Sequence, residues 1–329
     1  MGNEQLFIDG EFVDSADGAT FETRNPSDGS VLARVSRAGR PDVDRAVAAA
    51  RRAFDEGPWP SLTPQERSRV LLRMATLLQE RQGRLSQMEA EDAGHTLRAA
   101  NLFTIPLGIY HWQYFAEEAE RLAYTEPVPR TDFPAPAWQF VQREPYGVCA
   151  GIIPWNFPFL MAVWKTAPAL ATGNTVVLKP SPYTPLTALE LARVAQEAGL
   201  PNGVLNVVPG TGTVAGEALV TDPRVDRIGF TGSTAVGKRV MQLASASLSG
   251  SRWSWGGRVR PSCWTTPTWT WPSRAPCGAC TCTADRCARR ARVASSLRRC
   301  TTTSWPEWSR CPRPSRSEAP WTSRRTSAR

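Results

Sequence analysis

Short alternating runs of apolar and polar residues predict extended structure in three places. Residues 6–13, LFIDGEFV, alternate on either side of Asp9-Gly10 and predict a hairpin closed by a tight turn. Turn residues at 25–29 predict a second extended pair around them. Residues 138–143 also alternate and predict an exposed strand.

Three further segments have the spacing of amphipathic helices. Apolar residues recur every three or four positions over residues 43–54 and 70–78, which predicts two helices with one buried face each. Residues 96–121 follow the same spacing. That pattern is interrupted at Pro106, because proline cannot donate the helical backbone hydrogen bond.

From residue 147 onward, apolar runs of strand length alternate with helical segments. The predicted strands are residues 147–153, 175–178, 204–208 and 226–230. The predicted helices are residues 159–170, 184–199, a stretch from about 213, and 233–246. Thr184 is expected to cap the second of these helices, with Pro185 at its first position. Such alternation predicts an α/β fold with a parallel, doubly wound sheet, which binds ligands beyond the carboxyl ends of its strands.

Polar and glycine-rich motifs stand at those strand ends. They are PWNFP at 154–158, KPSPYTP at 179–185, PGTG at 209–212 and FTGST at 230–234. A lysine can donate to ribose hydroxyls, and glycines at helix starts let backbone amides approach phosphate, so the set favours a nucleotide. The G-x-x-x-x-G turn at 232–237 differs from the usual dinucleotide fingerprint, and glycines kept for packing are the alternative.

Composition divides the chain near residue 248. From residue 249 onward there are 16 Arg, no Lys and three acidic residues, a net charge of +13, whereas residues 1–248 hold 23 basic and 27 acidic residues, a net of −4. Seven of the eight Cys and eight of the 13 Trp follow residue 248, with one Leu and no Ile, Phe, Tyr or Met. We therefore expect a folded domain at 1–248 and a largely disordered tail at 249–329, which has little means of building a core.

The residue types in the tail also share a property of the genetic code. Of its 81 residues, 75 are Ser, Pro, Thr, Ala, Cys, Trp, Arg or Gly, whose codons all carry G or C at the second base. A GC-rich gene read one base out of frame produces this bias, whereas selection on a fold does not. The composition therefore predicts a frameshift near Leu248. A one-base shift lets the codons of residues 253–257 encode Val-Glu-Leu-Gly-Gly. It lets the codons of residues 284–288 encode a sequence that contains Gly-Gln-Val-Cys.

Four motifs, in order, resemble the NAD(P)-dependent aldehyde dehydrogenase superfamily. They are GIIPWNFP at 151–158, LATGNTVVLKPSPYTPLTAL at 170–189, GLPNGVLNVVPG at 199–210 and FTGSTAVGK at 230–238. The resemblance covers residues 6–248. It implies a Rossmann-type cofactor-binding domain, an aldehyde substrate, NAD or NADP as cofactor, and a homo-oligomer to which a strand near 138–143 contributes. The two reframed motifs are the ones that the family places next.

The resemblance also implies roles for individual residues. Asn156 matches the family's catalytic oxyanion amide, with an Asn that satisfies local turn amides as the alternative. The residues at cofactor-binding positions are Ile152, Pro154, Trp155, Lys179, Ser181, Gly212, Gly216, Thr231, Gly232, Ser233 and Val236. Those that would line the aldehyde tunnel, or else form plain core, are Phe157, Met161 and Trp164. Pro182 stands where many NAD-preferring members hold a Glu, which implies that NADP is tolerated.

The family's reaction needs two further residues that this chain lacks in register. A cysteine thiolate adds to the aldehyde, and a Glu-activated water hydrolyses the thioester after hydride transfer. The missing Glu codon would straddle Trp253 and Ser254, and the missing Cys codon Cys287 and Ala288. The chain also ends before the family's catalytic domain is complete. We therefore expect that it does not oxidise aldehydes as written.

Other interpretations of the tail stay open. Four cysteines between residues 277 and 287 have a C-x2-C-x-C-x4-C spacing that could bind zinc or copper, and the Arg and Trp residues could bind RNA through charge and stacking. The second-base bias supplies these residues without selection, so we expect no metal site and no specific nucleic-acid partner. Neither His95 nor His111 lies in a recognisable constellation, and both are expected to be structural or exposed.

No segment has the pattern of a targeting signal or a membrane span. Residues 1–9 are acidic, unlike a secretory signal, and the apolar stretch at 147–163 is interrupted by two prolines and Asn156. A cytoplasmic location is expected. The alternatives to an aldehyde dehydrogenase product are a non-catalytic nucleotide-binding remnant and, less favoured, a fusion with a basic tail that binds nucleic acid.

Overall fold

A seven-stranded sheet forms the centre of the fold. The computed structural model describes residues 2–131, 136–245 and 250–255, and of the last segment only the backbone. The strand order is β12-β11-β8-β9-β10-β2-β3. These strands are β2 (Leu6–Ile8), β3 (Glu11–Val13), β8 (Val148–Ile152), β9 (Thr175–Lys179), β10 (Leu205–Val207), β11 (Arg227–Gly232) and β12 (Gly250–Trp255). From β12 to β10 the neighbours pair in parallel, so the predicted parallel sheet is confirmed.

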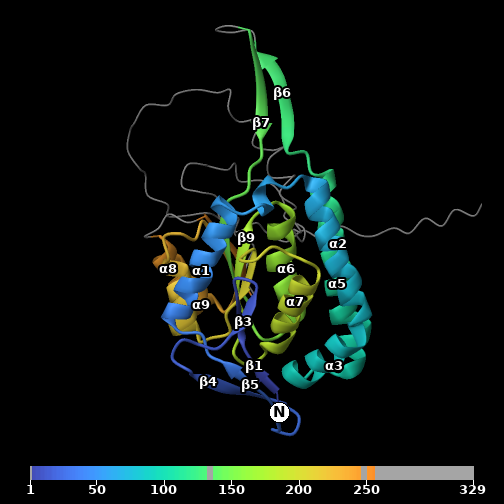
Figure 1. Ribbon diagram of the computed structural model, residues 1–329, viewed down its shortest axis with the longest axis vertical. Coiled ribbons are helices and arrows are strands. Elements are labelled where there is room, and N and C mark those ends of the chain that lie inside the picture. Colours follow the sequence, from blue (N-terminus) through green and yellow to red (C-terminus); the bar gives the residue numbers. More distant parts are fainter. Residues whose placement is uncertain (1, 132–135, 246–249, 256–329) are drawn as a thin grey trace, which may run out of the picture. The chain divides into compact units, whose positions relative to one another are not determined.

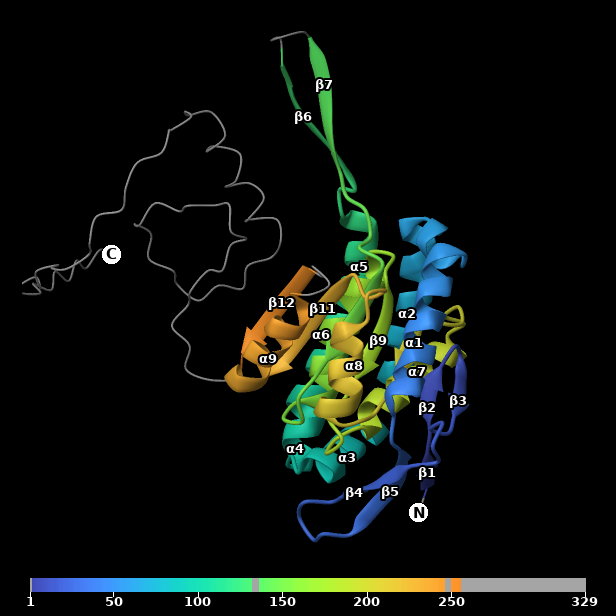
Figure 2. The same ribbon diagram turned by 90° about the vertical axis from the view of Figure 1, so that its left-hand side faces the viewer.

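Helices cover both faces of this sheet, which confirms the doubly wound architecture (Figures 1 and 2). One face carries α1 (Arg40–Asp55), α8 (Glu217–Thr221) and α9 (Thr234–Ala244), and the other carries α2 (Pro64–Glu80), α5 (Ile105–Arg121), α6 (Pro158–Ala171) and α7 (Leu186–Glu197). Successive side chains of β9 point to opposite faces. Val176 and Leu178 therefore join the core under α6, whereas Val177 joins the core under α1.

Smaller elements surround the main sheet. A three-stranded sheet has the order β1 (Gly2–Glu4), β5 (Val31–Ser36), β4 (Thr20–Arg24), and β6 (Thr125–Thr131) pairs with β7 (Ala137–Gln142) as a separate ribbon. The other helical elements are α3 (Gln82–Ala93) and the shorter η1 (Trp59–Ser61), α4 (Leu97–Ala99), η2 (Ala100–Thr104) and η3 (Gly212–Gly216). The three predicted extended regions correspond to β2–β3, β4–β5 and β7. Asp9 and Gly10 both have positive φ, as a tight hairpin turn requires.

Strand β12 lies within the segment that the sequence analysis assigned to the tail. It pairs in parallel with β11 over six residues, from Arg227 with Gly250 to Gly232 with Trp255. The rest of the predicted tail, residues 256–329, lies outside the described residues. The predicted disorder of that segment therefore stays a prediction.

Two expectations about helix starts need correction. Thr184 does not cap α7; its hydroxyl is buried and has no hydrogen-bond partner among the described residues, and Pro185 takes the cap position before a helix that begins at Leu186. The Asp92 carboxylate of α3 instead accepts from the Leu186 amide at 3.0 Å. The interruption in residues 96–121 is a π-helical turn, η2, and Pro106 lies in the first turn of α5, directly after it.

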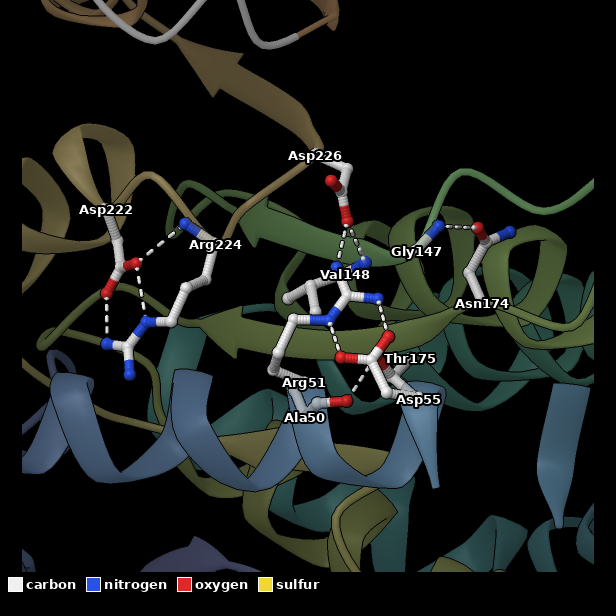
Figure 3. A network of polar contacts seen from close by, with 10 residues as sticks. All are labelled: Ala50, Arg51, Asp55, Gly147, Val148, Asn174, Thr175, Asp222, Arg224 and Asp226. Atoms are coloured by element: carbon white, nitrogen blue, oxygen red, sulfur yellow. Dashed lines mark hydrogen bonds and ion pairs between the residues drawn. The ribbon is translucent and has the colours of Figure 1, made fainter. Parts of the chain in front are cut away.

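A polar network at the amino ends of the parallel strands fastens α1 to the sheet (Figure 3). The Asp226 carboxylate, just before β11, accepts from Arg51 of α1 and from the Val148 amide, each at 2.8 Å. Arg51 also donates to Asp55, one turn further along α1, at 2.7 and 2.8 Å. Gly147 has φ of 123°, and a Cβ there would lie 2.0 Å from Asp226 Oδ2, so only glycine fits beside this carboxylate. Asp226 therefore links α1, β8 and β11.

We expect Asp226→Ala to lower the free energy of unfolding by about 2 kcal/mol, because the Arg51 guanidinium and the Val148 amide lose their shared acceptor. Asp226→Asn keeps an acceptor and should lose less. Asp55→Ala is the matched control, since this exposed partner of Arg51 contributes about 0.5 kcal/mol or less. Urea unfolding of the full chain measures all three variants. Equal losses for Asp226→Ala and Asp55→Ala would contradict the linking role.

Candidate nucleotide-binding and catalytic site

The four strand-end motifs meet along one edge of the sheet. Strands β11, β8, β9 and β10 are parallel neighbours, and the register pairs Phe230 with Ile152 and Ile152 with Lys179. The loops that follow these strands therefore stand in a row at the carboxyl edge. This is where a doubly wound sheet binds its ligand.

Lys179 is the last residue of β9 and lies almost wholly buried at this edge. Its ammonium donates to the carbonyl oxygens of Pro180 at 2.8 Å and Gly210 at 3.0 Å. An ammonium has three N–H donors, so a third can reach a ligand hydroxyl. Burial lowers the pKa of Lys179 to about 8. The side chain also lies beside Gly216, where an added Cβ would stand 3.7 Å from its Cδ.

The start of α9 presents backbone amides at the same edge. The Ser233 hydroxyl caps this helix by accepting from the Val236 amide at 3.4 Å. Gly232 leaves no room for a larger residue, because a Cβ there would lie 2.5 Å from Cζ of Phe230. Beside it, the Thr231 hydroxyl is buried without a partner in the described part of the chain. A capped helix start, a tight glycine and a free hydroxyl together suit an anionic ligand.

The PWNFP loop lies between these two features. Its first residues continue β8, and the Ile153 amide donates to the Lys179 carbonyl at 3.2 Å. Ile152 is buried and Pro154 half-buried, whereas Trp155 and Asn156 are exposed. The loop thus presents an indole and a primary amide beside Lys179 and the start of α9.

The remaining predicted cofactor residues lie after β9 and β10. Ser181 is buried, and its hydroxyl accepts from the Tyr183 amide at 3.2 Å, so it shapes the turn after β9. Gly212 and Gly216 begin and end the π-helical turn η3 after β10. A Cβ on Gly212 would meet nothing within 4 Å, so that position is open.

The three predicted tunnel residues have different surroundings. Phe157 is half-buried against the core, Met161 is buried within it, and Trp164 is 43 % exposed on α6. The indole of Trp164 donates to Nδ1 of His111 on α5 at 2.9 Å. A role in a tunnel stays a prediction for all three.

Both histidines contact predicted site residues, which the sequence analysis missed. His111 holds Trp164, as above, and His95 lies with Nε2 2.9 Å from the carbonyl oxygen of Asn156. Nδ1 of His95 faces the buried Glu89 at 3.9 Å. Burial raises the pKa of Glu89 to about 8. His95 and Asn156 are 61 positions apart, and His111 and Trp164 are 53 apart, and apolar periodicity carries no signal for such contacts.

Within the described ranges, no group of three or more His, Cys, Asp or Glu side chains has a geometry that could hold a metal ion. The four tail cysteines lie outside those ranges. None of the described helices combines the length and apolar character that a membrane crossing requires.

Comparison with known proteins decides the family. A profile of the aldehyde dehydrogenase family matches residues 12–258. The chain belongs to the aldehyde dehydrogenase family. The match includes β12 and so extends past residue 248. The aldehyde dehydrogenase fold and the sequence resemblance are thereby confirmed.

Individual relatives agree with this assignment. DhaS of Bacillus subtilis is 45% identical over 259 residues, which cover 78% of this chain and 51% of DhaS. The human mitochondrial 10-formyltetrahydrofolate dehydrogenase is 44% identical over 244 residues, 74% of this chain and 26% of that protein. The structure of the NAD+ complex of aldehyde dehydrogenase from Bacillus cereus superposes with a TM-score of 0.75 at 40% identity, covering 78% of this chain and 51% of that one. The chain thus spans about half the length, or less, of these relatives.

The low pKa of Lys179 predicts a pH dependence of stability. Its folded pKa of about 8 lies below the ordinary 10.5, so between these values the unfolded chain binds a proton that the folded chain does not. The free energy of unfolding should therefore rise with pH in this window, by at most about 1.4 kcal/mol per pH unit. Urea unfolding of wild type and Lys179→Gln at pH 8 to 10 measures the difference, with Lys238→Gln as an exposed control. A wild-type advantage that does not grow with pH would contradict the prediction.

Proposed function

We propose that this chain binds NAD or NADP at the carboxyl edge of its sheet and does not oxidise aldehydes as its sequence stands. The observation that carries the proposal is the buried Lys179 ammonium, held by two carbonyls beside the start of α9 and the PWNFP loop. Two structural neighbours, the aldehyde dehydrogenase from Bacillus cereus and the protein PnpE, were solved as complexes with NAD. The orphaned hydroxyl of Thr231 supports a polar ligand at this edge.

Each contact follows from the chemistry of the dinucleotide. The third N–H of Lys179 would donate to a ribose hydroxyl, and the amides around Gly232, Ser233 and Val236 would face the pyrophosphate. Gly212 and Gly216 would leave room for the adenosine end. Ile152, Pro154 and Trp155 would border the cleft, with Ser181 and Thr231 as polar neighbours. A bound nicotinamide would supply a hydride acceptor at this edge.

Pro182 bears on the choice between the two cofactors. It follows Ser181 in the turn after Lys179 and offers no carboxylate there. A 2′-phosphate would meet no repulsion from this position, so we propose that NADP is accepted about as well as NAD. A strong preference for NAD would contradict this.

The described thiol cannot serve as the nucleophile of the family reaction. Cys149 is the only cysteine in residues 1–255, and it lies near the amino end of β8, away from the carboxyl edge. Burial raises the pKa of its thiol to about 12, so almost no thiolate exists at neutral pH. Asn156 would still present its amide to an aldehyde oxygen, but no described thiol lies beside it to attack. An aldehyde substrate, a homo-oligomer and a cytoplasmic location stay predictions.

Calorimetric titration of the full chain with NAD, and separately with NADP, tests the binding. We expect Lys179→Gln to weaken both cofactors about tenfold, since it removes a charged donor, and Lys238→Gln to leave them unchanged. Aldehyde-dependent formation of reduced cofactor should be undetectable in the same samples. Turnover by the chain as written, or wild-type binding too weak to measure at millimolar cofactor, would contradict the proposal.

A one-base correction of the gene near codon 248 tests whether a frameshift explains the proposed lack of aldehyde oxidation. We expect the corrected product to oxidise aldehydes, because the frame then supplies the Glu and Cys that the family uses. Asn156→Ala in that product should lower kcat by about 100-fold or more, as loss of an oxyanion donor does. Steady-state kinetics measures both effects. A corrected product that binds cofactor but stays inactive would contradict the frameshift explanation.

A further inference from the structure

His95 contacts the loop that carries Asn156 in two ways. It follows α3, and its Nε2 lies 2.9 Å from the carbonyl oxygen of Asn156. A carbonyl oxygen only accepts, so Nε2 carries a proton and donates it. The imidazole also packs on Phe157, with ring centroids 5.3 Å apart and planes tilted by 55°. His95 therefore holds two consecutive residues of the loop.

Glu89 holds the other end of the same loop. It lies on α3 with no exposed surface, and its Oε2 accepts from the Phe159 amide in the first turn of α6 at 3.3 Å. The Phe159 amide is one of the first donors of α6, which have no acceptor within their own helix. Glu89 thus fixes the point at which the loop becomes helix.

The two side chains also face each other. Oε1 of Glu89 and Nδ1 of His95 are 3.9 Å apart; both atoms are buried, and neither makes a hydrogen bond of normal length in the described part of the chain. Buried polar atoms in folded proteins are nearly always hydrogen-bonded. A side-chain shift of about 1 Å would let one proton bridge these two atoms. They would then act as a unit.

We propose that His95 and Glu89 are positioning residues that fix the backbone of residues 156–159, and with it the direction in which Trp155 and Asn156 present their side chains. This rests on the proposed function, in which those two side chains face the cofactor and the aldehyde. His95 fixes the carbonyl before Phe157, and Glu89 fixes the amide after Pro158. The Asn156 side-chain amide takes no part in either contact and is left for a ligand.

Amide hydrogen exchange of the full chain, without cofactor, tests the positioning directly. His95→Phe keeps the ring against Phe157 and removes the donor, so we expect exchange across residues 156–159 to rise about tenfold. His95→Gln keeps a donor and should stay within about threefold of wild type. His111→Phe is the matched control, because that imidazole contacts α6 at Trp164 and not this loop.

Glu89 offers an independent pair of variants. Glu89→Leu removes the acceptor of the Phe159 amide and should raise exchange there about tenfold. Glu89→Gln supplies both an acceptor for that amide and a donor for Nδ1 of His95, so it should restore protection. Peptides from β9 report global unfolding in every sample. If one variant pair fails to fold, the other still tests the proposal at a different atom.

The outcomes separate this proposal from the proposed function. If His95→Phe and His95→Gln exchange alike in the loop, or Glu89→Leu and Glu89→Gln do, the positioning role is overturned. Titration of the same variants with NAD is the second readout, and we expect His95→Phe to bind several-fold more weakly than His95→Gln. If the His95 and Glu89 variants alter loop exchange as expected but the wild-type chain binds no NAD, the proposed function is refuted and the positioning pair stands.

Discussion

The burial of the Lys179 ammonium constrains the whole carboxyl edge of the sheet. A buried charge is tolerated only with hydrogen-bond partners, and here the partners are backbone carbonyls at the ends of β9 and β10. The loop after β10 must therefore come close to β9. Gly210 lets this loop pass close to Ala38 and Ala215, because a Cβ there would lie 2.8 Å from Ala215 Cβ and 2.9 Å from the Ala38 carbonyl oxygen. In the same loop, the carbonyl oxygen of Pro209 accepts a hydrogen bond from the Ala38 amide at 2.7 Å. This contact sets where the chain enters α1.

The sequence was informative wherever structure follows from local pattern. Strand β9 is buried on both sides, and its continuous apolar run is typical of a central parallel strand. The hairpin at Asp9-Gly10 and the cap at Ser233 depend on residues within three positions of each other. The start of α7 could not be predicted in this way. Asp92 reaches the Leu186 amide across 94 positions, and this contact replaced the local cap expected from Thr184.

The same distinction divides the candidate site. Lys179, Gly232 and Ser233 were predicted because the alternation of strands and helices places them at strand ends. The contacts of His95 and Glu89 depend on how α3 packs against the start of α6, and neither residue stands in a motif. A histidine in a turn and a glutamate on a helix are ordinary surface residues by pattern. The contacts of His95 with Asn156 and of the buried Glu89 with Phe159 follow only from tertiary packing.

Strand β12 shows how a segment whose composition departs from that of residues 1–248 joins the fold. It adds to β11 through a parallel ladder, whose hydrogen bonds use only backbone N–H and C=O groups. Residues 250–255 contain no proline, so every amide there can donate whatever the side chains are. This backbone pairing therefore does not depend on which side chains the proposed frameshift introduces. The family's reaction does depend on side chains, because particular residues must supply a thiolate and a carboxylate. Under the proposed frameshift, cofactor contacts made by residues 152–236 would survive while the reaction is lost.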